Sequence, residues 1–246
     1  MKNYYGSLCT EMYEILHKEA PREELEFYLS YAKKGQRILE PMCGSGRFLV
    51  PFAERSYDIT GVDLSEEMLD KLRRKRPEAK AVRADLTEYE PGEKFDYIFI
   101  PSGSLSLLTG LSVCKAVLGK LKELLAEGGK LVFAVETLGC RRPDDEDYQI
   151  TASVKTREGL DLLLKTKHFY DEETQTQFSP GIYELYREGE LLQREEMDFQ
   201  THLYRFGEME EYLREAGFSS VQLFSSFQKD PAADSQCEMF LFECGR

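Results

Sequence analysis

Residues 37–47 read R-I-L-E-P-M-C-G-S-G-R, and an apolar helical pattern begins at residues 48–50. The stretch predicts a short strand that ends in an acid, Glu40, and then a turn in which Gly44 and Gly46 flank a serine. Glycines let a backbone approach a ligand closely, and the start of the following helix presents unpaired N–H groups. Because ligands bind beyond the carboxyl ends of strands in parallel α/β sheets, this stretch predicts a ligand-binding loop in such a sheet.

The loop departs from the dinucleotide fingerprint G-x-G-x-x-G at two points. Leu49 occupies the position of the third glycine, so the close helix-to-strand packing of that glycine is not provided for, and the carboxylate of Glu40 would repel a pyrophosphate. An adenosyl ligand with a free amino acid tail suits Glu40 better, because that tail carries an ammonium group. A nicotinamide-dependent oxidoreductase therefore stands as an alternative function rather than the leading one.

Two further predicted strands are also followed by acids. Residues 58–62 precede Asp63. In such units an acidic residue about 20 residues after the glycine loop binds the ribose hydroxyls, and the distance from Glu40 to Asp63 is close to that spacing. Ser65 then supplies the N-cap of a helix with acids in its first turn. A third strand at residues 79–84 precedes Asp85. Three acids at three strand ends predict one polar edge of the sheet.

The alternation of strands and helices continues to residue 140. An apolar run at residues 94–100 predicts a central fourth strand, which the turn at residues 101–104 follows. Residues 113–125 have helical spacing. The glycine pair at residues 128–129 is expected to end that helix before a fifth strand at residues 130–135.

The motifs I-L-E-P-M-C-G-S-G at residues 38–46 and D-L-S-E-E-M-L at residues 63–69 resemble those of class I, Rossmann-like S-adenosylmethionine-dependent methyltransferases of the small-molecule type. The resemblance covers residues 36–140 and, with fewer matches, residues 206–246. It implies an α/β fold with a seven-stranded sheet, helices on both faces and S-adenosylmethionine as the cofactor. The turn I-P-S-G after the fourth strand differs from the D/N/S-P-P-aromatic motif of nucleic-acid amino-methyltransferases, which disfavours that subclass.

This resemblance implies that the donor lies against the loops that follow the first four strands. Glu40 is expected to face the amino acid end of the donor, Asp63 to accept both ribose hydroxyls, and Asp85 to receive the adenine amino group. The full set of expected cofactor-binding residues is Glu40, Met42, Gly44, Ser45, Gly46, Arg47, Asp63, Leu64, Met68, Asp85, Leu86, Pro101, Ser102 and Gly103.

The βα rhythm stops in the region that follows the fifth strand. Turn signals separate four β-patterned runs, at residues 150–157, 160–170, 181–187 and 191–204. These runs predict an antiparallel β meander inserted between strand five and the last helix, as a substrate lobe or a dimer contact. The expected organisation is an N-terminal helical cap at residues 1–35 (helices at 8–17 and 21–34), a methyltransferase core at residues 36–140 and 206–246, and an inserted lobe at residues 141–205.

The sequence constrains the acceptor site less than the donor site. In-line transfer from a sulfonium mainly requires positioning, and a base is needed only when the acceptor is protonated. His202 and Tyr13 are the catalytic candidates, although His202 also fits a structural role. The substrate-binding candidates are Tyr5, Ser104, Tyr183 and Arg205, with Glu184 as a further pocket candidate and with a salt bridge as the other role open to Arg205.

Composition narrows the range of partners. The 246 residues carry a net charge of −13, whereas nucleic-acid binding needs a basic face, so no nucleic-acid substrate is expected. No apolar run reaches the roughly 18 residues that span a membrane, and the first residues lack an apolar secretory segment, which predicts a cytoplasmic protein without a membrane partner. Six cysteines without CxxC or CxxH spacing are expected to be reduced thiols, mostly buried, with no metal site.

The leading expectation is an enzyme of the EC 2.1.1 class, a monomer or homodimer. It would transfer a methyl group in line from S-adenosylmethionine to a small-molecule acceptor, with an amine as the first choice. N, O, S and C acceptors all stay open at this stage. Besides the oxidoreductase, a non-catalytic S-adenosylmethionine-binding module is an alternative, but it would favour a degenerate loop, and the loop at residues 38–46 is intact.

Overall fold

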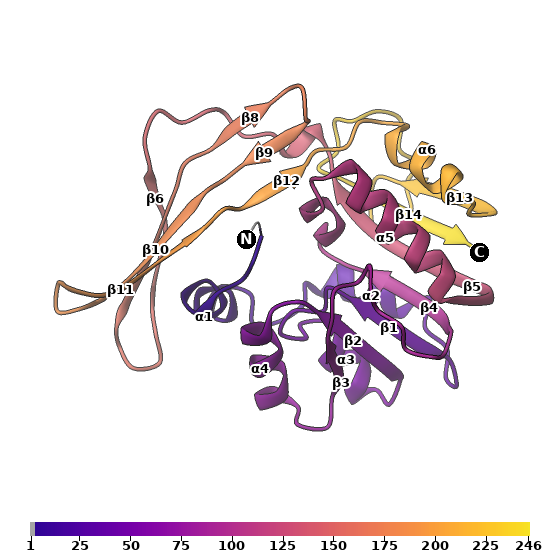
Figure 1. Ribbon diagram of the computed structural model, residues 1–246, viewed down its shortest axis with the longest axis horizontal. Helices are drawn as coiled ribbons and strands as arrows, with labels where there is room; N and C mark the ends of the chain where they lie inside the picture. The colour runs from indigo at the N-terminus through magenta and orange to yellow at the C-terminus, as the bar shows by residue number, and fades with distance from the viewer. Residues whose placement is uncertain (1–2) are drawn as a thin grey trace.

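A computed structural model describes residues 3–246, so the first two residues of the expected N-terminal cap lie outside the described chain. At its centre is a seven-stranded sheet with the order β13-β14-β5-β4-β1-β2-β3 (Figure 1). The strand β14 runs antiparallel to both of its neighbours, β13 and β5, and the other neighbouring pairs are parallel. The strands are β1 (Arg37–Pro41), β2 (Asp58–Asp63), β3 (Lys80–Arg83), β4 (Phe95–Ile100), β5 (Leu125–Glu136), β13 (Ser220–Phe224) and β14 (Met239–Gly245).

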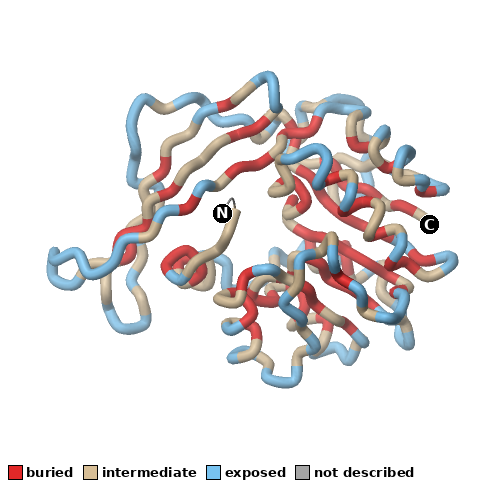
Figure 2. Tube along the Cα trace, in the orientation of Figure 1, coloured by how far each residue is buried: buried red, intermediate tan, exposed pale blue. Residues whose placement is uncertain are grey.

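Helices cover both faces of this sheet, because its central strands are apolar on both sides. Along β4, Tyr97 and Phe99 point to one side and Ile98 and Ile100 to the other, as the alternation of side chains along a strand requires. The first side packs against α2 (Arg22–Leu29), α3 (Leu49–Glu54) and α4 (Glu66–Lys75), and the second against α5 (Leu111–Leu124) and α6 (Glu208–Glu215). The buried strands form the main core of the molecule (Figure 2).

Two helix ends differ from the expectation. The helix α2 ends at Leu29 instead of continuing to residue 34, because the next backbone hydrogen bonds, from Tyr31 to Tyr28 and from Ala32 to Leu29, span only three residues. The glycine pair at residues 128–129 does not end α5. That helix already ends at Leu124, and the pair lies inside β5, where the pairing register with β4 shifts and Gly128 has φ of +71°.

The close packing expected of a third loop glycine comes from a strand instead. A Cβ atom on Gly61 of β2 would lie 2.5 Å from Cδ1 of Leu49 and 2.6 Å from Sγ of Cys43. The side chains of Leu49 and Cys43 therefore reach the sheet through the space that Gly61 leaves. This arrangement holds the start of α3 against the sheet without a glycine in α3.

The insertion after β5 forms two small antiparallel sheets rather than one continuous meander. One has the order β11-β10-β7-β6, and the other has the order β12-β9-β8. The expected runs 160–170 and 191–204 each divide between the two sheets, and β9 was not expected from the sequence. The strands are β6 (Gln149–Lys155), β7 (Asp161–Thr166), β8 (Phe169–Asp171), β9 (Thr176–Phe178), β10 (Gly181–Arg187), β11 (Glu190–Met197) and β12 (Gln200–His202).

The helix α1 (Ser7–Leu16) lies between the insertion and the main sheet (Figure 1). Its buried face joins residues of β7, β10 and β11 in a separate small core, made of Leu8, Cys9, Met12, Leu162, Tyr183 and Met197. The carboxylate of Glu195 accepts hydrogen bonds from the backbone N–H groups of Leu8 and Cys9 at the start of α1, at 3.0 and 3.1 Å. A negative charge at the N-terminus of a helix also interacts favourably with the helix dipole. The two helices of the expected cap therefore contact different parts of the molecule, α1 the insertion and α2 the main sheet.

Two further expectations concern cysteines and membranes. All six cysteines are free thiols, and Cys9, Cys43, Cys114 and Cys244 are buried. Within residues 3–246, none of the helices combines the length and the apolarity that crossing a bilayer needs.

Candidate active site

The first cavity lies at the carboxyl ends of β1, β2 and β4 and has a volume of about 270 Å³. Residues 3–5 and Tyr13 line it from the N-terminal part of the chain, and residues of α5 line it opposite the strand ends. Most of the expected cofactor residues meet there: Glu40, Met42, Gly44, Arg47, Asp63, Leu64, Met68, Asp85, Leu86, Pro101 and Ser102. The sequence-based expectation missed an apolar part of the wall, formed by Leu107, Leu108, Val113 and Val117.

The loop after β1 turns through backbone conformations that favour glycine. Gly44 and Gly46 have φ of +52° and +79°, and Met42 has +57°. A Cβ atom on Gly46 would collide with the side chain of Leu72 in α4. Gly46 therefore shapes the loop without lining the first cavity.

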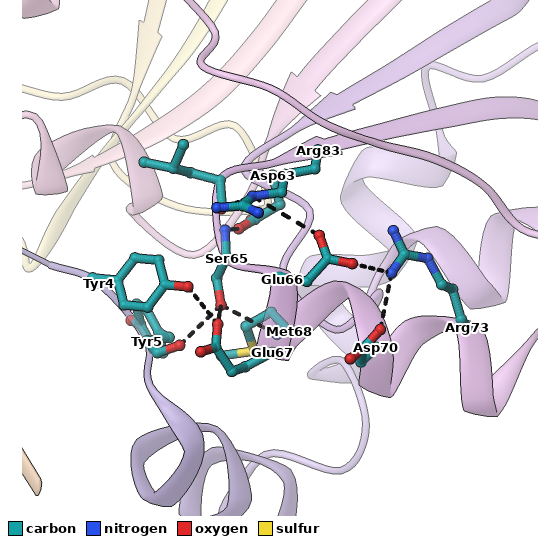
Figure 3. Close-up of polar contacts among 11 residues, drawn as sticks. Tyr4, Tyr5, Asp63, Ser65, Glu66, Glu67, Met68, Asp70, Arg73 and Arg83 are labelled. Carbon is teal, nitrogen blue, oxygen red and sulfur yellow. Dashed lines mark hydrogen bonds and ion pairs between the residues drawn. The ribbon is translucent and has the colours of Figure 1, made fainter.

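Asp63, at the end of β2, fixes the two loops beside it. Its Oδ2 accepts a hydrogen bond from the backbone N–H of Gly44 at 2.7 Å. Its Oδ1 accepts one from the backbone N–H of Ser65 at 2.8 Å, a contact that Figure 3 draws. Burial raises the pKa of the Asp63 carboxyl, and these backbone hydrogen bonds oppose the rise. A carboxylate oxygen has room for a second hydrogen bond, so Asp63 can still accept from a ligand in the cavity.

The N-terminal segment is fastened over the same site. The hydroxyl of Tyr4 donates a hydrogen bond to the carboxylate of Glu67 at 2.5 Å. The hydroxyl of Ser65 donates one to the carbonyl of Tyr5 at 2.9 Å. Figure 3 draws both contacts. The Ser65 oxygen also accepts from the Met68 N–H as the N-cap of α4. On the opposite side, the side-chain amide of Asn3 donates to the carbonyls of Leu107 and Gln200, both at 2.8 Å. The segment thus bridges the main sheet and the insertion.

Two residues that line the first cavity, the buried acid Glu40 and the partly buried cation Arg47, each have a polar atom without a partner in the part of the chain that the structure describes. The Oε2 atom of Glu40 and the Nε atom of Arg47 are both buried, and neither has a hydrogen-bond partner within the described residues. Burial raises the pKa of the Glu40 carboxyl well above its ordinary value, and Arg47 opposes this rise. Buried polar atoms are ordinarily hydrogen-bonded, so these two atoms point to a polar ligand.

A third acid, Glu24, stands behind Arg47 and was not found from the sequence. It is 5% exposed, and its Oε1 accepts a hydrogen bond from the backbone N–H of Ser102 at 2.6 Å. The Ser102 hydroxyl lies 3.2 Å from both Glu24 oxygens and accepts from Nη2 of Arg47 at 2.5 Å. A polar chain thus runs from α2 through the turn after β4 to Arg47. Only its position in the folded chain, not a sequence motif, identifies Glu24.

Asp85 and Ser104 line the first cavity with their side chains already engaged. Asp85 is exposed, and its Oδ1 accepts hydrogen bonds from the N–H and the hydroxyl of Thr87, at 2.9 and 2.7 Å. The hydroxyl of Ser104 donates to the carbonyl of Pro101 at 2.9 Å. Asp85 keeps a free oxygen, since both bonds use the same one.

A second cavity of about 680 Å³ adjoins the first, and Tyr5 and Tyr13 line both. It lies between α1, the insertion and the end of β5. Its apolar wall consists of Cys9, Met12, Leu16, Ala152, Leu164, Met197 and Phe199, and its polar wall includes Glu136, Arg142, Thr151, Thr166, His168, Gln177, Ser179, Tyr183, Thr201 and Glu238. Burial raises the pKa values of the Tyr5, Tyr13 and Tyr183 hydroxyls, so these groups act as hydrogen-bond donors and not as bases at neutral pH.

Glu136 is an acid of the second cavity that lies beside the turn after β4. A Cβ atom on Gly103, in that turn, would lie 3.1 Å from Cγ of Glu136. Burial raises the pKa of the Glu136 carboxyl, while a hydrogen bond with Thr201 and the charge of Arg142 oppose the rise. The sequence analysis expects Glu136 just after the fifth strand and gives it no role. Its position at the end of a central strand, beside the expected donor loops, is the sequence feature that could have identified it as a site residue.

Several expected residues line neither cavity. Nε2 of His202 is hydrogen-bonded to Oε1 of Glu208 at 2.7 Å, which ties β12 to α6. Arg205 is exposed, and Glu184 pairs with Lys165 at 2.7 Å. The geometry therefore gives His202 a structural role rather than that of a base. Ser45, Gly46 and Gly103 also lie outside both cavities. The hydroxyl of Ser45 accepts a hydrogen bond from Lys75.

Comparisons with known proteins find similarity to methyltransferases. Residues 38–129 match a family described as "Methyltransferase domain". A protein of Geobacillus sp. (strain WCH70) that carries a methyltransferase name is 27% identical, over 93% of this chain and 94% of its own length. The dTDP-3-amino-3,4,6-trideoxy-alpha-D-glucopyranose N,N-dimethyltransferase of Streptomyces venezuelae is 28% identical, over 42% of this chain and 44% of its own length.

A solved structure shares the whole fold. The sugar N-methyltransferase KedS8 of Streptoalloteichus sp. ATCC 53650 superposes with a TM-score of 0.74 at 18% identity. The superposition covers 100% of this chain and 97% of that one. The fold that the sequence predicted is confirmed by this likeness.

Proposed function

We propose that this chain, which belongs to the class I S-adenosylmethionine-dependent methyltransferases, transfers the methyl group to an amine nitrogen of a small molecule. Membership of this family removes the nicotinamide-dependent alternative. The observation that carries the proposal is the second cavity, which adjoins the first at Tyr5 and Tyr13 and contains the carboxylate of Glu136.

The first cavity is the proposed donor site, and its free polar atoms fit the donor's amino acid tail. Oε2 of Glu40 would accept from the ammonium group, and Nε of Arg47 would donate to the carboxylate. Asp63 would accept the ribose hydroxyls, and Asp85 the adenine amino group. When bound, the donor supplies an electrophilic methyl group on a sulfonium. Ser45, Gly46 and Gly103 would act through the shape of the loops and not by contact.

The second cavity is the proposed acceptor site. An amine is an ammonium ion at neutral pH and must lose a proton before it can attack the methyl group. Because burial raises the pKa of Glu136, its carboxylate is a better proton acceptor than an exposed glutamate. Tyr13, which lines both cavities, would orient the acceptor as a hydrogen-bond donor.

The names of related proteins favour an amine on a sugar. The Streptomyces venezuelae relative is an N,N-dimethyltransferase of an amino sugar nucleotide, and KedS8 is named a sugar N-methyltransferase. In this chain the polar wall of the second cavity offers hydroxyl and amide groups such as Thr151, Gln177 and Thr201. Such groups suit a hydroxyl-bearing acceptor. Amino sugars are therefore the first class of acceptor to test.

The test is a turnover assay with matched acceptors. The enzyme is incubated with S-adenosylmethionine and with amino sugars, their N-acetylated forms and the corresponding sugars in which a hydroxyl replaces the amine, and release of S-adenosylhomocysteine is measured. We expect turnover with free amines alone. Turnover of the hydroxyl analogues without turnover of any amine would overturn the proposal.

A further inference from the structure

Glu24 is a buried carboxylate in a helix whose neighbouring buried residues are aromatic. Phe27 and Tyr28 of α2 pack into the main core, whereas Glu24 points to the turn after β4. A charged side chain almost never lies fully buried unless it has partners. The partners of Glu24 are the N–H and the hydroxyl of Ser102, and the hydroxyl links it to Arg47.

Ser102 itself holds an uncommon backbone conformation. Its φ is +55°, a value that costs energy for a residue with a side chain. The short hydrogen bond from its N–H to Glu24 secures that conformation. The Ser102 oxygen then receives the hydrogen bond from Nη2 of Arg47 at the floor of the first cavity.

Arg47 is thereby held between two acids. Its charge opposes the raised pKa of both Glu24 and Glu40, although burial is the largest cause of the rise in each case. Rings on two sides confine the guanidinium, with its Cζ 5.7 Å from the ring centre of Tyr13 and 5.3 Å from that of Phe48. One hydrogen bond to Ser102 fixes Nη2, and Nε stays free.

From this geometry we propose that Glu24 is a positioning residue for the donor's carboxylate. Acting through Ser102, it fixes the guanidinium of Arg47 so that its free N–H binds that carboxylate. Glu24 touches no part of the donor. Without Glu24, Ser102 loses the partner of its N–H and Arg47 loses the anchor at its Nη2. The inference rests on the donor site proposed above and needs nothing of the acceptor.

The experiment compares two donors that differ only in the carboxylate, S-adenosylmethionine and its decarboxylated form. Their affinities are measured by competition with S-adenosylhomocysteine, without any acceptor. We expect the wild type to bind S-adenosylmethionine at least about tenfold more tightly, the effect of one hydrogen bond to a charged group. In Glu24→Ala this preference should fall to about twofold or less, through loss of affinity for S-adenosylmethionine alone.

Two further variants keep the test decisive. Glu24→Gln retains groups that can bond the N–H and hydroxyl of Ser102 and removes only the charge, so it should show an intermediate preference and should fold even where the alanine variant does not. Glu23→Ala changes an exposed acid of the same helix and should keep the wild-type preference. Thermal unfolding without ligand shows that each variant is folded.

Two results would contradict the proposal for Glu24. Equal affinity of the wild type for both donors would overturn the assignment of Arg47. An unchanged preference in both Glu24 variants, even with weaker binding of both donors, would mean that Glu24 only supports the fold of the cavity. Since no acceptor is present, neither result depends on amine methylation.

Discussion

The first and second cavities are built from different kinds of structure. The first lies at the strand ends of a sheet that is buried on both faces, and the loops around it are fixed by backbone hydrogen bonds, such as those from Gly44 and Ser65 to Asp63. The second is walled by α1 and by the strands of the insertion, whose buried residues form only a small core. Figure 2 shows burial concentrated in the main sheet and mixed along the insertion. The proposed donor site thus lies in the part of the molecule with the larger buried core.

The two cavities also differ in their polar groups. In the first, Glu40 and Arg47 keep buried atoms without partners. In the second, many polar side chains already bond one another, as Nδ1 of His168 does with the hydroxyl of Ser179 at 2.8 Å. The difference suggests that the first cavity is preorganised for a single charged ligand. In the second cavity, our proposal assigns recognition of the acceptor to the shape of the cavity and to Glu136.

The largest expected effect is on the chemistry in the second cavity. Glu136→Gln should lower kcat for an amine by about 10²–10⁴-fold, the contribution of a general base, and leave the affinity for S-adenosylhomocysteine unchanged. In the wild type, kcat/KM should rise with pH as Glu136 loses its proton, at a pH above that of an ordinary glutamate because its pKa is raised. Steady-state kinetics across pH measure both. An unchanged kcat in the variant would remove Glu136 from the mechanism.

The next effect sharpens the role of the first cavity. Asp63→Ala removes the acceptor for both ribose hydroxyls and should weaken binding of S-adenosylhomocysteine by about 100-fold, the cost of two hydrogen bonds to a charged group. Asp63→Asn keeps one oxygen and should lose less. Calorimetry gives both affinities. Wild-type affinity in the alanine variant would show that the ribose lies elsewhere.

A smaller effect separates function from stability. Glu40→Gln should weaken S-adenosylhomocysteine by about tenfold and yet raise the free energy of unfolding by about 1–3 kcal/mol, since it removes a buried carboxylate with a free oxygen. Because the folded-state pKa of Glu40 is raised, its unfavourable effect is absent below the unfolded value near pH 4.3 and grows as pH rises toward the folded pKa. Denaturant unfolding at pH 4 and pH 8 measures this. A destabilised variant at pH 8 would contradict it.

The smallest effect tests a residue outside both cavities. His202→Asn should change kcat and KM by less than about twofold and lower stability by about 1 kcal/mol, because His202 contributes a hydrogen bond to Glu208 and an edge-on ring contact with Tyr204. Kinetics with the best amine acceptor and thermal unfolding give the two quantities. A drop in kcat of tenfold or more, together with loss of the pH dependence, would restore His202 as the base.

The sequence predicted most of the first cavity because its residues follow strands at fixed places. A strand end, a glycine turn and an acid are local features, and the parallel sheet brings Glu40, Asp63 and Asp85 to one edge. Glu24 carries no such local sign. It reaches the site from α2 only because the chain between α2 and β1 returns that helix to the turn after β4.

The insertion resisted prediction for a related reason. Its alternating pattern indicates strands, but it does not tell where a strand bends from one sheet into the next, as β7 does into β8. Which side chains meet α1 depends on that bend. Tyr183 lines the second cavity, whereas His202 does not, because β12 carries it past this cavity toward α6.

We expect donor and acceptor to meet beside Tyr5 and Tyr13, which line both cavities. A crystal structure with bound S-adenosylhomocysteine tests it most directly. We expect the ribose on Asp63, the carboxylate on Arg47, and the sulfur facing Tyr5 and Tyr13, toward Glu136. A ligand whose sulfur points away from the second cavity, or whose ribose does not contact Asp63, would contradict the account.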